Sequence, residues 1–350
     1  MSSIRDVAKL ANVSVSTVSS FINNNKTISE ELRIRINKAV IDLDFQTNPV
    51  ARSLKNRKSG TIGVILPKIT SIFFPQLLNG IEQTASKNGY SIMYFDSLQD
   101  LNKEKKYVNM LTQYWVEGII LDSSADPDKD KDYIEFLVNK VVRNKKIPIV
   151  SLEGVLADDV ISSVSIDNVY GGYLATKHLI DIGCKSIAHI TGYQVFKFSQ
   201  GRTVGYKSAL KEYGLPCDEH LIRNGDFSPL SGYNAMKELL KEKRTFTGLF
   251  AANDQEAIGA MKAIKESGLR IPEDIAVVGF DNVTFASLVE PSLTSINISK
   301  YQLGCLAMES LIKNIKNGDT APIHQKSEIN LIIRHSSEPK ASCSWDLSGW

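Results

Sequence analysis

The chain has 350 residues, 43% of them hydrophobic, and a formal net charge of +2. This length predicts two or three domains, and the sequence predicts neither a signal peptide nor a membrane-spanning helix, which needs about 18 apolar residues. The charge is unevenly distributed: ten basic and five acidic side chains give residues 1–58 a net +5, leaving −3 for the rest. A basic head on a mildly acidic body suits phosphate binding by the head alone.

Residues 4–23 have the pattern of a helix-turn-helix. Ala8 is small where two helices must touch, and Asn12 tolerates the positive φ that the turn needs. Ser14 can cap the second helix, while Val18 faces a small core. Residues in the first turns of such a second helix, on the face that points away from the core, contact base edges in the major groove. They are Val15, Ser16 and Ser20.

Short polar side chains around these positions are candidates for phosphate contacts, which set register without reading sequence. They are Ser14, Thr17, Ser19 and Asn23. A third helix is predicted over residues 29–44, where Ser29 is the expected N-cap and is also counted among the DNA-binding candidates. Its apolar face has helical spacing and consists of Leu32, Ile36, Ala39, Val40 and Leu43.

A short hinge helix is predicted next, with Asn48 as its cap and Pro49 in its first position. Leu54 is an apolar residue on an otherwise basic and polar hinge, where Arg52 and Lys55 flank it. Residues 56–60 read as a polar linker. We therefore expect a DNA-binding domain over 1–47 and a hinge with its linker over 48–59.

Strand and helix patterns alternate from residue 61 onward, which predicts βαβ units and parallel sheets. The first set of apolar runs covers 61–66, 91–95, 118–121 and 147–152, with helices at 75–88 and 101–114. The second set covers 164–166, 186–191, 248–252 and 275–280, with helices beginning near Val169, Arg202, Leu230 and Asp254. Two such sets predict two similar α/β lobes with a cleft between them. Residues 338–350 lack periodicity and are expected to form a disordered tail.

The helix-turn-helix of residues 4–23, followed by Asn48-Pro49-Val50-Ala51-Arg52-Ser53-Leu54-Lys55, resembles the LacI/GalR family of bacterial transcriptional repressors. The resemblance extends over residues 3–336. It implies an all-α DNA-binding head and an α/β core of two doubly wound parallel-sheet lobes, similar to periplasmic binding proteins. It also implies a homodimer that binds operator DNA.

The resemblance assigns roles to the DNA-binding candidates. Val15, Ser16 and Ser20 match the base-reading positions, although Ser20 stands where many relatives have an Arg that grips guanine. Leu54 matches a residue that wedges into the minor groove and kinks the DNA, and Arg52 and Lys55 can meet phosphates. The alternative for Leu54 is a place in the core of the first lobe.

The resemblance also places three crossovers between the lobes, near residues 159–163, 290–293 and 321–325. Lobe one is then expected at about 60–160 and 291–323, and lobe two at about 161–290 and 324–337. A helix over 300–317 is expected to return to lobe one.

Ligands of doubly wound sheets bind beyond the carboxyl ends of the strands. Arg202, Asn253 and Asp281 follow strands of the second set and can hydrogen-bond vicinal hydroxyls, and the matching residues of sugar-responsive relatives contact the effector. Apolar faces for a sugar ring are expected from aromatic residues near the same ends. They are Phe73, Phe74, Phe196, Phe198 and Phe227. Asp254 is expected to cap a helix, and Asp281 could do the same.

Several readings stay open. The effector is expected to be a sugar, but Phe196 and Phe198 leave room for a purine, and a catabolite regulator with a phosphorylated carrier protein as co-repressor is a third possibility. A ligand-binding protein or enzyme on the same fold is the alternative from another class. No catalytic motif, metal motif or cofactor motif is found. The four cysteines are far apart, which indicates reduced thiols and a cytoplasmic protein.

Overall fold

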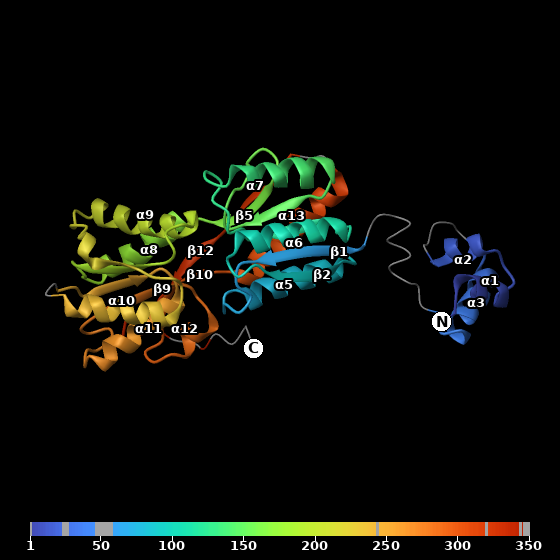
Figure 1. Cartoon of the computed structure of the whole chain (residues 1–350). Helices are drawn as coiled ribbons and strands as arrows, with labels where there is room; N and C mark the ends of the chain where they lie inside the picture. Colours follow the sequence, from blue (N-terminus) through green and yellow to red (C-terminus); the bar gives the residue numbers. More distant parts are fainter. Residues whose placement is uncertain are drawn as a thin grey trace. The chain divides into compact units, whose positions relative to one another are not determined.

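The computed structural model describes residues 2–22, 28–45, 59–242, 245–318, 321–342 and 345. The chain divides into two compact units, Met1–Ser59 and Gly60–Trp350 (Figure 1). Each unit is described by itself.

The described residues of the first unit form three helices, α1 (Ile4–Leu10), α2 (Val15–Ile22) and α3 (Glu30–Asp42). Ser14 and Ser29 cap α2 and α3, because their hydroxyls accept from the backbone N–H groups of Thr17 at 3.1 Å and Leu32 at 3.4 Å. Asn12 has φ +51°, as the turn requires. Six fully packed side chains form the core: Val7, Ala8, Ala11, Val18, Ile36 and Ala39. The predicted helix-turn-helix is confirmed.

The second unit contains two six-stranded sheets. The first has the order β11-β5-β4-β3-β1-β2 and the second β12-β10-β9-β8-β6-β7. All pairings are parallel except β10 with β12. The first sheet is made of β1 (Thr61–Leu66), β2 (Ser91–Asp96), β3 (Gly118–Leu121), β4 (Ile149–Leu152), β5 (Ser162–Ile166) and β11 (His324–Ser327). The second is made of β6 (Ile187–Thr191), β7 (Ile222–Asn224), β8 (Gly248–Ala251), β9 (Ala276–Asp281), β10 (Thr294–Ile298) and β12 (Ile329–Ile332).

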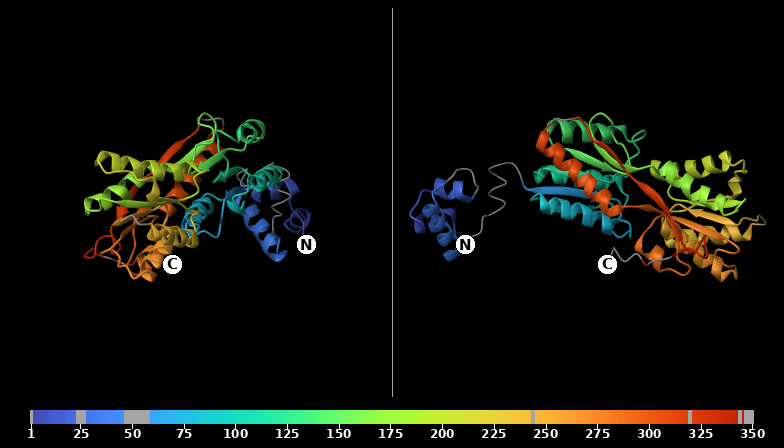
Figure 2. Two further views of the ribbon diagram at one scale, coloured as in Figure 1. Left: turned by 60° about the vertical axis from the view of Figure 1, so that its left-hand side comes forward. Right: turned by 180° about the vertical axis from the view of Figure 1, so that it is seen from behind.

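Helices cover both faces of each sheet (Figures 1 and 2). Those of the first sheet are α5 (Phe74–Lys87), α6 (Leu101–Gln113), α7 (Lys131–Glu135) with its π-helical continuation η1 (Phe136–Asn144), and α13 (Lys300–Asn317). Those of the second are α8 (Asn168–Asp181), α9 (Lys197–Glu212), the 3₁₀ turn η2 (Glu219–Leu221), α10 (Pro229–Lys241), α11 (Asp254–Glu266) and α12 (Thr284–Leu288). The expected return of the helix over 300–317 to the first sheet is confirmed, because α13 packs on α5 and on β3, β4 and β5.

Burial on both faces explains why the strands are continuous apolar runs and not alternating ones. In β1, Ile62 and Val64 face the cluster beneath α5 and α13, while Ile65 faces the cluster beneath α6 and η1. The carboxyl ends of these strands are thereby held firmly. The predicted fold class, a helical head and two doubly wound lobes, is confirmed.

The lobe boundaries differ from the expected ones. Our assignment of 164–166 to the second sheet is wrong, because β5 pairs with β4 and β11 of the first sheet. β10 likewise pairs with β9, so residues 294–298 lie in the second sheet. Each crossover therefore comes later than predicted, after β5, after β10 and between β11 and β12. We call residues 60–166 and 299–327 lobe one, and residues 167–298 and 328–337 lobe two.

The expected disordered tail is only partly described. Residues 338–342 include a turn in which the Ala341 N–H donates to the Glu338 carbonyl, and residues 343–344 and 346–350 lie outside the described residues.

Candidate effector pocket and nucleic-acid interface

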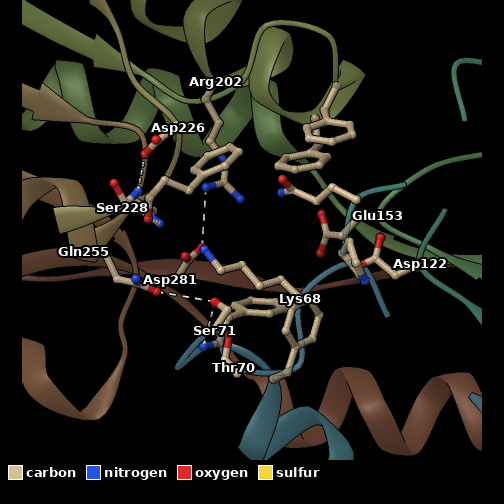
Figure 3. A pocket seen from close by; sticks show the side chains of 18 of the residues that line it. Lys68, Thr70, Ser71, Asp122, Glu153, Arg202, Asp226, Ser228, Gln255 and Asp281 are labelled. Atoms are coloured by element: carbon tan, nitrogen blue, oxygen red, sulfur yellow. Dashed lines mark hydrogen bonds and ion pairs between the residues drawn. The ribbon is translucent and has the colours of Figure 1, made fainter. Parts of the chain in front are cut away.

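A cavity of about 250 Å³ lies between the two lobes and is lined equally by both (Figure 3). All eight predicted effector residues line it: Phe73, Phe74, Phe196, Phe198, Arg202, Phe227, Asn253 and Asp281. The structure therefore brings together side chains that are separated by up to 208 positions in the sequence. The cavity has the size and mixed lining of a small-molecule site.

Sheet topology explains why these residues meet. Residues 67–74 follow β1, Gln99 follows β2, Asp122 follows β3 and Glu153 follows β4, so four strand ends of lobe one contribute. In lobe two, Phe227 follows β7 and Asn253 follows β8, while Asp281 ends β9. Parallel strands place all these ends at one edge of each sheet, and the two edges face each other across the cavity.

Backbone strain is concentrated at the same edge. Four cavity-lining residues other than glycine have positive φ: Gln99 at +60°, Glu153 at +58°, Phe227 at +65° and Asp281 at +98°. This conformation is costly for side chains with a Cβ and is retained mainly where function requires it. We take the clustering as independent support for a binding site.

Arg202 is the central cation of lobe two and is only 4% exposed. Its Nε donates to Asn168 Oδ1 at 2.9 Å and its Nη1 to the Ala252 carbonyl at 2.5 Å. The guanidinium stacks on the Phe280 ring with 3.8 Å between Cζ and the ring centroid. Close packing of α9 on α8 fixes this position, since a Cβ on Gly172 would lie 2.1 Å from the Arg202 carbonyl oxygen.

Asp281 faces Arg202, with Oδ1 and Nη1 3.4 Å apart. Burial raises the pKa of Asp281, and the charges of Arg202 and Lys300 partly oppose that rise. Lys300 fixes the end of β9, because its Nζ donates to the backbone carbonyls of Asp281 at 2.6 Å and Asn282 at 2.9 Å. Asp281 is therefore a carboxylate at a braced strand end and does not cap a helix.

The helix α11 is capped by Asn253 and not, as expected, by Asp254. Asn253 Oδ1 accepts from the Glu256 N–H at 2.8 Å, and its Nδ2 donates to the Phe227 carbonyl at 3.1 Å. Asp254 is fully buried and accepts instead from the Val283 N–H at 2.7 Å and the Ser295 hydroxyl at 2.5 Å. Burial, with the neighbouring Asp281 charge, raises the pKa of Asp254 to about 7. Asn253, the first polar residue after β8, therefore caps α11, and Asp254, the second, fixes the loop that follows Asp281.

Three phenylalanines of lobe two form a continuous aromatic wall. Phe196 stacks on Phe198 with centroids 5.4 Å apart, and Phe198 stacks on Phe227 at 5.7 Å. Across the cavity, Phe73 and Phe74 of lobe one pack edge to face at 5.3 Å. Such faces can bind the C–H surface of a sugar ring or a planar base.

The buried carboxyl of Glu256 supports this wall from behind. Its Oε1 accepts from the Phe227 N–H at 2.8 Å and from the Ser231 hydroxyl at 3.3 Å. Burial raises the pKa of Glu256 to about 8. Glu256 therefore fixes the backbone that presents Phe227 to the cavity.

The sequence reading missed several residues that line the cavity. Asp122 and Glu153 directly follow the predicted strands 118–121 and 147–152, so the same strand-end rule would have found them. Lys68 and Gln255 sit further into a loop and a helix, and no pattern marked them.

Several described contacts join the lobes around the cavity, among them the hydrogen bond of Lys300 to the Asp281 carbonyl. Ser71 donates to Gln255 Oε1 at 3.3 Å, and Asn168 Nδ2 donates to Glu153 Oε2 at 3.4 Å. At the rim, Lys197 Nζ lies 2.6 Å from Asp128 Oδ2. The structure thus shows the lobes in contact on several sides of the cavity.

The DNA-binding candidates of the first unit lie on or near α2. Ser14, Val15 and Ser16 are exposed, while Thr17, Ser19 and Ser20 are partly exposed. Val15 is 42% exposed although it is apolar, and such an exposed apolar side chain is suited to contact the methyl group of a thymine. Ser29 caps α3 and is exposed. The candidates Asn23, Asn48, Arg52, Leu54 and Lys55, and the expected hinge helix, lie outside the described residues.

The described part of the chain offers neither a membrane-spanning helix nor a cluster of metal-binding side chains. No helix there is long and apolar enough to cross a membrane. Nor do its His, Cys, Asp and Glu side chains form a group of three or more that could hold a metal ion.

Comparison with known proteins identifies both parts of the chain. The family described as "Bacterial regulatory proteins, lacI family" matches residues 3–48, and "Periplasmic binding protein-like domain" matches residues 176–337. The ribose operon repressor of Halalkalibacterium halodurans is 34% identical over 97% of this chain and 98% of its own. The HTH-type transcriptional repressor PurR of Photorhabdus laumondii is 35% identical over 91% of each chain.

A solved structure agrees with these relatives. The lac repressor dimer bound to operator and the anti-inducer ONPF superposes with a TM-score of 0.86 at 28% identity, covering 96% of this chain and 99% of the other.

Proposed function

The chain belongs to the LacI family of bacterial regulatory proteins, and from this premise we propose that it represses transcription as a homodimer whose operator affinity is set by a small molecule. The observation that carries the proposal is the cavity in which all eight residues singled out as effector contacts meet. A head that binds DNA and a core that binds a ligand give the two sites that allosteric control needs.

We propose that the effector is a sugar or another polyhydroxyl compound. Arg202 and Asp281 offer hydroxyls a donor and an acceptor, and the aromatic wall offers an apolar face. The similarity to a ribose operon repressor supports this class. The similarity to PurR keeps a purine as the second candidate, because Phe196, Phe198 and Phe227 can stack on a planar base as well.

We propose that the chain is a regulator and not an enzyme, and that it works in the cytoplasm, where its DNA target lies. In this proposal the chain is divided into domains at 1–47, 48–59 and 60–337, and residues of α2 and the hinge contact DNA. The DNA contacts proposed on α2 and its capping residue are Ser14, Val15, Ser16, Thr17, Ser19 and Ser20.

A mobility-shift assay with the full chain and genomic DNA fragments tests the DNA-binding role. Ser16→Asp puts a negative charge on the exposed start of α2 and should weaken binding at least tenfold, because it faces phosphates and base acceptors. Asn37→Asp adds the same charge on an exposed position of α3 and is the matched control. Equal binding by Ser16→Asp, Asn37→Asp and the unmodified chain would remove α2 as the DNA-reading element.

A further inference from the structure

The wall of the cavity that lobe one provides is acidic. Asp122 and Glu153 both line the cavity from adjacent strands, since β3 and β4 are paired with Leu121 opposite Ser151. Figure 3 shows the two carboxyl groups next to each other on one side of the cavity. A third carboxyl, Glu104 of α6, is fully buried behind them and accepts from the Ser123 hydroxyl at 2.5 Å and the Ser124 N–H at 2.8 Å.

Asp122 has no compensating partner in the described part of the chain. Asp122 is 8% exposed and lines the cavity, and none of the hydrogen bonds or ion pairs among the described residues involves its side chain. The charged groups that act on it are Glu153 and Glu104, and both repel it, so together with burial they raise the pKa of Asp122 well above its ordinary value. An unpartnered buried carboxyl that faces a cavity is costly to the free protein and needs an explanation.

Glu153 is only partly satisfied. One oxygen, Oε2, accepts from Asn168 at a long 3.4 Å, and the other, Oε1, is buried without a partner among the described residues. The charge of Arg202 lowers the pKa of Glu153, but burial raises it by more. Arg202 itself is already engaged by Asn168, the Ala252 carbonyl and Asp281.

The charges around the cavity do not balance. Its lining includes four carboxyl groups, Asp122, Glu153, Asp226 and Asp281, against two cations, Lys68 and Arg202. Arg202 is paired with Asp281, and the charge of Lys68 acts on Asp226. Asp122 and Glu153 are therefore two carboxyl groups of the lining that have no ion-pair partner among the described residues.

We infer that the effector carries a protonated amino group that lies against Asp122 and Glu153, while its hydroxyls meet Arg202 and Asp281. The ligand class is an amino sugar or another aminated polyol. The inference rests on the proposed function, because it names the chemistry of the same cavity. A bound ammonium would give Asp122 its missing partner through charge-assisted hydrogen bonds.

The test is a thermal-shift and calorimetric screen of the full-length chain at pH 7 with matched pairs of probes. The pairs are D-glucosamine with D-glucose, D-galactosamine with D-galactose, D-mannosamine with D-mannose and 1-amino-1-deoxysorbitol with sorbitol. N-acetylglucosamine, D-ribose, adenine and calcium chloride complete the panel. We expect at least one amine to bind at least tenfold more tightly than its neutral parent. Binding of the neutral parent, ribose, adenine or calcium at equal strength, or no binding by any amine, would overturn the inference.

Two variants give an independent readout. Asp122→Asn and Glu153→Gln should weaken binding of the amine roughly ten- to hundredfold, the usual range for losing a charged hydrogen-bond partner. Asp122→Asn should also raise the melting temperature of the unliganded chain, because it removes repulsion between buried carboxyls. A lower melting temperature would show that the charge serves structure and would overturn its role as a ligand partner.

Glu135→Gln removes a carboxylate from an exposed position of α7 and is the control for both variants. Each variant is also assayed for operator binding without ligand. Retained operator binding together with no preference for amines would refute the inference and leave the proposed function intact. If the unmodified chain itself does not bind operator DNA, the proposed function is refuted.

Discussion

Arg202 and Asp281 face each other with 3.4 Å between Nη1 and Oδ1, and their side chains are 4% and 9% exposed. Charged hydrogen bonds of this kind are usually 2.7–2.9 Å long. The pair is therefore loose, and Asp281 Oδ1 is buried without a hydrogen bond in the described part of the chain. A ligand hydroxyl placed between these two groups would donate to the carboxylate and accept from the guanidinium, so the unliganded pair is poised for such a group.

Asp281→Ala is expected to abolish the ligand response. It removes the acceptor for a hydroxyl and leaves Arg202 buried without its partner, which costs roughly 3–5 kcal/mol of stability. The measurement is a titration of operator binding with the ligand found by screening. Operator binding without ligand should survive if the ligand is an inducer, and should stay weak with ligand present if it is a co-repressor. Glu273→Ala, at an exposed position of the same lobe, is the control. An identical ligand response in both variants would place the effector site elsewhere.

The contribution of Glu256 to stability is expected to fall as the pH rises from about 4.5 to about 8, whereas His189, whose pKa burial lowers to about 4, acts in the opposite direction below about pH 6.5. The pKa of Glu256 is about 8 in the folded chain, against an ordinary value of 4.5. Between these values the unfolded chain is ionised while the folded chain keeps its proton, so each pH unit in the window lowers the free energy of unfolding by about 1.4 kcal/mol. Asp254, with a pKa of about 7, acts in the same direction.

Glu256→Gln tests this pH dependence, because Gln preserves the acceptor for Phe227 and Ser231 but cannot ionise. Melting curves of the full chain at pH 5, 6, 7 and 8 should show a smaller decline for the variant. Parallel declines in the two proteins would contradict a protonated Glu256.

Much of the cavity lining could be predicted from the sequence. The reason is that the carboxyl ends of parallel strands can be recognised as polar residues that directly follow apolar runs. Asn253 and Asp281 follow this rule, whereas Arg202 lies eleven residues beyond the end of β6, inside α9, and is assigned through the family resemblance. Asp122 and Glu153 obey the same rule in lobe one, where each directly follows a predicted apolar run. Lys68 and Gln255 depend on loop geometry, which local sequence does not reveal.

The lobe boundaries could not be read from the sequence with the same success. β5 and β10 are followed by crossovers, and nothing in their apolar runs says which sheet they join. Partner choice is decided by non-local pairing, here of Val164 with Leu152 and of Ile296 with Phe280. The sequence also predicted the wrong cap for α11, Asp254 instead of Asn253. The two residues are adjacent and both can cap a helix, so only their surroundings in the fold decide between them.

Operator binding is expected to weaken steeply with salt. The segment 1–58 carries a net charge of +5, and each phosphate neutralised contributes roughly −0.9 to the slope of log affinity against log salt concentration. Fluorescence anisotropy with labelled operator at several potassium chloride concentrations measures this slope. A slope near zero would remove DNA as the partner of the head.

Leu54→Ala is expected to leave folding intact and to weaken operator binding and bending. Leu54 lies outside the described residues, and the prediction rests on one apolar side chain on a basic and polar hinge. An apolar side chain inserted between base pairs costs free energy, because it unstacks them. The resulting bend offsets this cost, because bent DNA makes more contacts with the protein. Gel phasing compares the bend angles of the two proteins on one operator. The same bend angle in the variant would refute the wedge.

The rim contact between Lys197 and Asp128 is expected to favour the closed lobes by a small amount. The two groups lie 2.6 Å apart but are 55% and 77% exposed, and exposed ion pairs contribute roughly 0.2–1 kcal/mol. Asp128→Lys replaces attraction by repulsion across the rim and should weaken ligand binding about two- to fivefold. Adding Lys197→Asp restores an ion pair of opposite sense and should recover most of that loss. Because salt screens exposed charges, the difference should vanish at high ionic strength. If the single and double variants bind ligand equally well in low salt, the pair does not couple the lobes, and closure then depends on the contacts inside the cavity.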